Sequence, residues 1–162
     1  MRQTVTLALL ALLVSGCVST TSAPYGNQLP ASGPSPDRLA DDALTQLEKL
    51  YPPAHVRFEL QQVATDAFGA SLLKGLRERG YAVLEFDPRV SSQAASTAAV
   101  AVRGSFSTTP ASGALPLRYV LDQAGSPDLY RLTLVIGGQS LTRAYRPQDG
   151  VLLPAGYWSR QE

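Results

Sequence analysis

Strict alternation of apolar and polar residues across the C-terminal half is the feature that most constrains the fold. Leu115 to Leu121 carries a large apolar residue at every second position, and Tyr130 to Ile136 repeats the pattern. Alternating side chains lie on opposite faces of a strand, so each segment predicts a strand with one buried face. Gly137-Gly138 is a two-residue hairpin turn, after which Gln139 to Arg146 returns along the sheet. The region therefore predicts an antiparallel meander.

The segment before the meander predicts two helices. Ser35-Pro36-Asp37 predicts a helix start with Ser35 as the cap, and Pro52-Pro53 predicts its end. Thr65-Asp66 begins a second helix, for which Gly80 provides the left-handed exit. The apolar residues expected to be buried are Leu39, Ala43, Leu47 and Leu50 in the first helix and Phe68, Leu72, Leu73 and Leu76 in the second.

Two predicted strands flank the second helix, at His55 to Leu60 and at Tyr81 to Phe86. A strand, a helix and a strand in this order usually form a right-handed crossover between parallel strands. Ala98 to Phe106 is a further, weaker strand candidate. The predicted fold class is α+β: a small sandwich of two helices packed on a mixed sheet that ends in an antiparallel meander.

The N-terminus predicts a lipoprotein signal peptide over residues 1–16. Arg2 precedes an apolar run of ten residues, about half of the 20 or so that a membrane-spanning helix needs. Val14-Ser15-Gly16-Cys17 resembles the bacterial lipobox, in which the chain is cleaved between Gly16 and Cys17 and the cysteine receives the lipid. The sequence thus predicts a membrane anchor on Cys17, and several acyl chains together hold a protein stably.

The residues after the cysteine predict where the domain works. Position 18 is Val and not the Asp that commonly retains lipoproteins at the inner membrane, which favours the periplasmic leaflet of the outer membrane. Residues 17–34 contain no charge and are rich in Ser, Thr, Ala, Gly and Pro, which predicts a flexible linker. We expect an α+β domain over residues 35–146 and a tail over residues 147–162.

Charge and residue types exclude several kinds of chemistry. The chain has 14 basic and 13 acidic residues, and removal of Arg2 with the signal leaves 13 of each, too few cations for direct nucleic-acid binding as a main role. The single cysteine excludes an internal disulfide. His55 is the only histidine, so the sequence offers no ligand set for zinc, and we predict neither a metal nor a cofactor. His55, Asp41-Asp42 and the pair Glu85 and Asp87 are expected at solvated surfaces, and no catalytic site is predicted.

The tail combines apolar residues with proline and glycine. Two interpretations of the tail are possible: it folds over its own sheet, or Tyr157 and Trp158 dock a partner protein. Aromatic residues of this kind dominate binding hot spots, and an extended segment can add to the edge of a partner's sheet.

Several blocks along the chain together resemble the TrbH lipoproteins of conjugal-transfer operons. These blocks are the lipobox at Cys17, Ala43 to Leu47, Tyr51 to Ala54, Phe68 to Ala70, Leu76 to Val83, Tyr119 to Asp122, Leu129 to Leu134, Gly137 to Tyr145 and Ala155 to Trp158. The resemblance covers essentially the whole chain and transfers no catalytic residue.

The resemblance implies a structural part in mating-pair formation, the type IV secretion apparatus that moves DNA between cells, with other channel proteins as partners. The alternative is an auxiliary envelope lipoprotein that binds a lipid or solute for a transporter. A large apolar pocket between the helices and the sheet would favour that alternative.

Overall fold

The computed structural model describes residues 25–30, 35–89 and 113–162. The predicted signal peptide, Cys17 and the strand predicted at Ala98 to Phe106 lie outside these residues. Within the described residues, no helix is long and apolar enough to cross a membrane.

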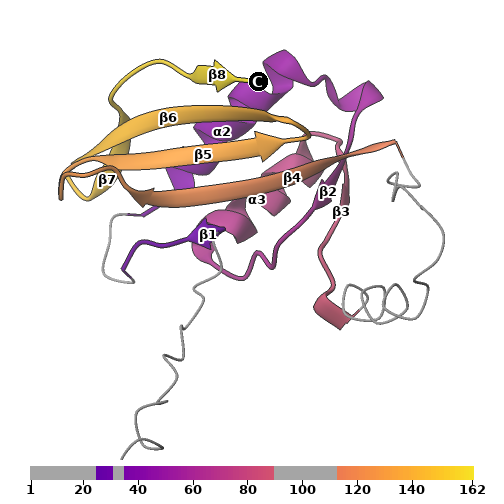
Figure 1. Cartoon of the computed structure of the whole chain (residues 1–162), viewed down its shortest axis with the longest axis horizontal. Helices are drawn as coiled ribbons and strands as arrows, with labels where there is room; N and C mark the ends of the chain where they lie inside the picture. The colour runs from indigo at the N-terminus through magenta and orange to yellow at the C-terminus, as the bar shows by residue number, and fades with distance from the viewer. Residues whose placement is uncertain (1–24, 31–34, 90–112) are drawn as a thin grey trace, which may run out of the picture.

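The predicted meander is confirmed as three long antiparallel strands (Figure 1). They are β4 (Ala114–Gln123), β5 (Tyr130–Ile136) and β6 (Gln139–Gln148). Gly137 turns the β5–β6 hairpin with φ of 61°, a conformation that glycine adopts without steric cost. Leu121 lies opposite Leu132 in the register, so the apolar positions of neighbouring strands share one face.

The predicted parallel unit is also confirmed. Strand β2 (Arg57–Leu60) is followed by α3 (Ala67–Glu78) and by β3 (Ala82–Leu84), which pairs parallel with β2. Strand β2 also runs parallel to the start of β4 and so joins this unit to the meander. The result is a mixed sheet in the order β3-β2-β4-β5-β6-β7, which confirms the α+β class.

Helices α2 (Asp37–Leu50) and α3 cover one face of the sheet, behind β4, β5 and β6 in Figure 1. A short 3-10 turn, η1 (Pro53–His55), leads from α2 to β2. The predicted stripe of α2 is buried at Leu39, Ala43 and Leu47, while Leu50 is half-buried. Ala40 and Leu44 are buried as well. The buried stripe of α2 is therefore wider than predicted. Helix α2 packs against α3 on one side and against the sheet below, so two surfaces cover it.

The two helices begin differently from one another. Helix α3 begins after Thr65-Asp66 as predicted, and the structure shows Asp66 as its cap: Oδ1 of Asp66 accepts the backbone N–H of Gly69 at 2.9 Å. The cap predicted for α2 is wrong: the cap position is Pro36, and the Ser35 hydroxyl donates to the Asp37 side chain. Helix α3 ends at Glu78, and Gly80 provides the predicted left-handed exit two residues later, with φ of 83°.

Both ends of the described chain add to the sheet. Strands β7 (Val151–Pro154) and β8 (Ser159–Gln161) pair one after the other with the same edge of β6. Of the two readings of the tail, folding over its own sheet is therefore confirmed. Strand β1 (Gly26–Asn27), within the range predicted as linker, pairs parallel with β4. The sequence did not predict this pairing, because two residues are too few to show alternation.

Candidate functional site

A polar cluster joins helix α2 to strand β6 beneath the tail. One nitrogen of Arg143, Nη1, donates to both carboxylate oxygens of Asp42, at 2.7 and 2.9 Å. The Tyr145 hydroxyl donates to Oδ2 of the same carboxylate at 2.6 Å. Asp42 and Arg143 are only 25% and 18% exposed, so this pair is much less screened by water than a surface ion pair.

Arg143 also fixes the segment that connects β7 to β8, which we call the tail loop (Ala155 to Trp158). Its Nε donates to the carbonyl oxygen of Gly156 at 2.8 Å. Its guanidinium lies 5.9 Å from the centre of the Trp158 ring, within the range of a cation–π contact. Trp158 is half-buried against the core. One arginine therefore ties helix, sheet and tail loop together.

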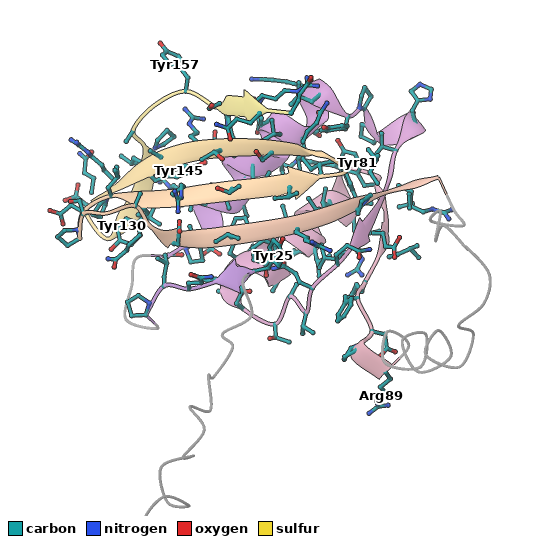
Figure 2. The ribbon with its side chains drawn as sticks, viewed as in Figure 1. Tyr25, Tyr81, Arg89, Tyr130, Tyr145 and Tyr157 are labelled. Carbon is teal, nitrogen blue, oxygen red and sulfur yellow. The ribbon has the colours of Figure 1, made fainter. Side chains whose placement is uncertain are left out.

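Tyr157 has the opposite environment from its neighbour Trp158. Its side chain is 95% exposed and points away from the body of the protein (Figure 2). Tyrosine is among the residue types that dominate binding hot spots. The structure thus separates the two predicted docking residues: Trp158 anchors the tail loop, and Tyr157 is the residue that it presents.

A groove of about 360 Å³ lies between α2 and the tail loop. We call it the tail groove. It is lined by Asp42, Thr45, Gln46, Lys49, Arg143, Tyr157 and Trp158. Because Asp42 and Arg143 neutralise each other, the lining keeps one uncompensated charge, the ammonium of Lys49. That ammonium has no ion-pair partner in the described part of the chain.

Sequence reasoning found two of these residues and missed the polar ones. The prediction that Asp42 lies at a solvated surface is wrong, because the side chains of Arg143 and Tyr145 bind its carboxylate. The missed signal was in β6, where Arg143 occupies an inward position between the buried Leu141 and Tyr145. A cation at a buried-face position requires an anionic partner nearby.

Other residues weighed from the sequence lie elsewhere. His55 is exposed at the end of η1 and does not line the tail groove. Asp41 and Glu85 each meet an arginine: Asp41 lies 3.6 Å from Arg79, and Glu85 pairs with Arg77. Within the described ranges, no three His, Cys, Asp or Glu side chains come together as a metal site would require.

A second polar cluster is buried between α3 and β4. The Tyr119 hydroxyl donates to Asp66, the cap of α3, and the backbone N–H of Tyr119 donates to Oε1 of Gln62 at 3.0 Å. The Tyr119 ring packs on Phe68 with centroids 5.0 Å apart. This cluster fixes the start of α3 on the sheet and shares no residue with the tail groove.

We expect Tyr145 and Tyr119, the tyrosines of the two polar clusters, to make the fold sensitive to alkali. Burial raises the pKa of Tyr145, and so does its hydrogen bond to Asp42; burial and then Asp66 do the same for the pKa of Tyr119. The folded state therefore keeps protons that the unfolded chain loses near pH 10. Above about pH 10, the raised pKa of each tyrosine should lower the free energy of unfolding by about 1.4 kcal/mol for each pH unit. Below about pH 10, neither tyrosine should make the free energy of unfolding depend on pH.

Urea unfolding between about pH 9 and about pH 11 measures this slope. Tyr145→Phe and Tyr119→Phe should each reduce the slope by about 1.4 kcal/mol per pH unit, while Tyr157→Phe, at the exposed ring, leaves it unchanged. An equal slope in all four proteins would show that these hydroxyls do not hold their protons through the fold.

Comparison with known proteins identifies the chain's family. The family model described as "Conjugal transfer protein TrbH" matches residues 19–162. The chain belongs to the TrbH family. No curated protein and no solved structure matches it. The resemblance read from the sequence is thus confirmed, and this TrbH protein is a component of conjugal transfer. Membership implies a place in the cell envelope and association with other proteins of the transfer apparatus.

Proposed function

We propose that this TrbH protein is a lipid-anchored structural component of a conjugative type IV secretion apparatus, held at the periplasmic leaflet of the outer membrane by Cys17. The observation that carries the proposal is the position of the family match. It begins at residue 19, two residues after the lipobox cysteine, and runs to residue 162. The residues before the match hold the predicted signal peptide and Cys17, so the match covers the predicted linker and the domain that Cys17 would anchor.

The tail loop supports a scaffold that contacts other proteins. Arg143 holds the loop through two groups, the Gly156 carbonyl oxygen and the Trp158 ring, and Tyr157 is left in water. A fixed loop loses little conformational entropy when a partner binds, and a tyrosine offers a large contact area with only two side-chain torsions. We therefore assign partner docking to Tyr157, with Trp158 as the residue that supports the loop.

The alternative, a lipid- or solute-binding lipoprotein, expects an apolar cavity between helices and sheet. In the described part of the chain this layer is filled by side chains: Phe58, Phe68 and Tyr119 are all fully buried there. The tail groove, at the surface, is lined largely by polar residues. The packing therefore favours the scaffold.

The test is transfer of the plasmid or element from a strain that lacks the gene and is complemented by single variants. We expect Tyr157→Ala to lower transfer, since truncation of one central aromatic residue of an interface can cost roughly 2 kcal/mol or more. Trp158→Ala should lower transfer as well, because the loop that presents Tyr157 loses its contact with Arg143 and the core. Tyr157→Ala separates docking from folding, because its exposed ring contributes no packing. His55→Ala should complement fully.

Immunoblots of the membrane fraction control for protein level. Loss of transfer with His55→Ala at a normal level would revive an enzymatic or ligand-binding role. Full complementation by both aromatic variants would withdraw the docking assignment and leave the scaffold role standing.

A further inference from the structure

The tail groove offers a partner one free charge. Three acidic groups of α2 are already paired. Asp42 is held by Arg143, and Glu48 lies 3.4 Å from Arg79, which also meets Asp41. Lys49 is exposed and has no such partner within the described ranges. The groove therefore presents an ammonium at the α2 side and an aromatic ring at the tail-loop side.

Both features are in place before any partner arrives. Strands β7 and β8 pair with β6 on either side of the tail loop, and Arg143 binds the loop's Gly156 carbonyl oxygen between them. Lys49 belongs to the last turn of a 14-residue helix whose buried face packs on the sheet and α3. A preformed groove with fixed walls lowers the entropic cost of binding.

We propose that the tail groove binds an extended acidic segment of another transfer-apparatus protein. The ammonium of Lys49 pairs with a side-chain carboxylate of that segment, and the Tyr157 ring covers an adjacent apolar side chain. Gln46 also lines the groove and supplies an amide that can donate to and accept from an extended backbone, while the Thr45 hydroxyl, which donates to the Asp41 carbonyl oxygen, can still accept. This inference rests on the proposed docking role of Tyr157 and specifies the chemistry of its partner.

The charge and size of the groove favour a carboxylate on a peptide over other anions. Phosphate recognition commonly uses the bidentate fork of an arginine, and the arginine that lines this groove is already bound to Asp42. Nucleic acids and anionic membranes attract clusters of several cations, whereas this lining has one that is free. About 360 Å³ is near the lower end of the range for ligand pockets, with room for a few side chains.

The experiment uses full-length protein in mating donor cells, with Tyr157→p-benzoylphenylalanine as a photoreactive probe. After irradiation, the attached segment is mapped by mass spectrometry. We expect a segment of a transfer-apparatus protein with an Asp or Glu within about three residues of the attachment point, since three residues of a strand span about 10 Å.

A charge exchange then tests the pairing. Lys49→Glu should lower the crosslink yield about fivefold, as expected for loss and reversal of one partly exposed ion pair. Substitution of the partner's acidic residue by Lys should restore the yield in the Lys49→Glu background. The matched control is Arg38→Glu, which reverses the charge of another exposed basic residue of α2 that does not line the groove; it should leave the yield unchanged.

Several results would overturn the inference: no crosslink, crosslinks only to lipid or to a second copy of this chain, an attached segment without an acidic residue, or a yield unaffected by Lys49→Glu. The transfer frequency of the same strains separates this failure from failure of the proposed function. If transfer requires the gene but Lys49→Glu leaves the crosslink yield unchanged, only the groove assignment fails. If deletion of the gene leaves transfer intact, the proposed function fails as well.

Discussion

Gly69→Ala is expected to lower the free energy of unfolding by about 3 kcal/mol or more. A β-carbon at position 69 would lie 2.8 Å from the β-carbon of Ala64 and 3.0 Å from its α-carbon, and it would overlap the Tyr119 hydroxyl. Overpacking of this kind costs about 1–3 kcal/mol. Displacement of Tyr119 would also break its buried hydrogen bond to Asp66, at a further cost of about 1–3 kcal/mol.

The predicted loss of stability in Gly69→Ala is informative, because helix propensity alone predicts that this substitution stabilises the protein. Alanine is favoured over glycine in a helix interior by up to about 1 kcal/mol. Gly75→Ala in the same helix is the matched comparison. Its β-carbon would meet the ends of two side chains, Leu44 and Arg79, and no backbone atom, so we expect a smaller loss than at position 69. Urea unfolding followed by the fluorescence of Trp158, the chain's single tryptophan, measures both. A Gly69→Ala protein as stable as the wild type would contradict the described packing of α3 on β4.

Most of the fold could be predicted from the sequence, because its signals are local. The alternation of apolar and polar residues predicted the strands of the meander. The 3.6-residue periodicity of apolar residues predicted the buried faces of α2 and α3. Gly80 and Gly137 mark turns that need a positive φ, and both have one. Thr65-Asp66 marked the start of α3 because that signal is local, and the capping contact of Asp66 spans only three residues.

Features that depend on distant parts of the chain could not be predicted. Asp42 and Arg143 are 101 residues apart, so no local pattern relates them. Strands β7 and β8 carry no long alternation, and they form because the edge of β6 supplies hydrogen-bonding partners. The cap at Ser35 failed for a local reason, since the hydroxyl binds the Asp37 side chain instead of a backbone N–H.

The two predicted docking residues also show which features the sequence can predict and which need the fold. Sequence composition pointed to Tyr157 and Trp158 together, as aromatic residues in a tail. Only the fold shows that Arg143 contacts Trp158 and leaves Tyr157 exposed. The groove beside them is made by α2 and the tail loop, two elements that lie far apart in the chain.

Cys17→Ser is expected to abolish lipidation and release the protein from membranes. The predicted lipobox contains the chain's single cysteine, so no second thiol can take the lipid. Burial of acyl chains contributes about 0.8 kcal/mol for each CH₂, so several chains hold a protein stably and their loss removes that anchor. Labelled palmitate should enter the wild-type protein and not the variant, and the variant should leave the membrane fraction. Incorporation at the wild-type level would show that Cys17 is not the lipidated residue.

Ser15→Ala is the matched control for this test. It changes a small residue of the predicted signal peptide, two positions before the cysteine, and keeps the thiol that receives the lipid. We expect this variant to incorporate labelled palmitate and to fractionate with membranes as the wild type does. Loss of lipidation in both variants would show that the effect of Cys17→Ser comes from disturbing the signal peptide and not from the missing thiol.

The most direct test of the central claim measures two quantities in one deletion strain: the frequency of transfer and the nicking of DNA at the transfer origin. A structural part of the envelope channel predicts that transfer is lost while nicking stays at the wild-type level, that the wild-type gene restores transfer, and that Cys17→Ser does not. Normal transfer from the deletion strain with no second copy of the gene, or loss of nicking in that strain, would contradict the account.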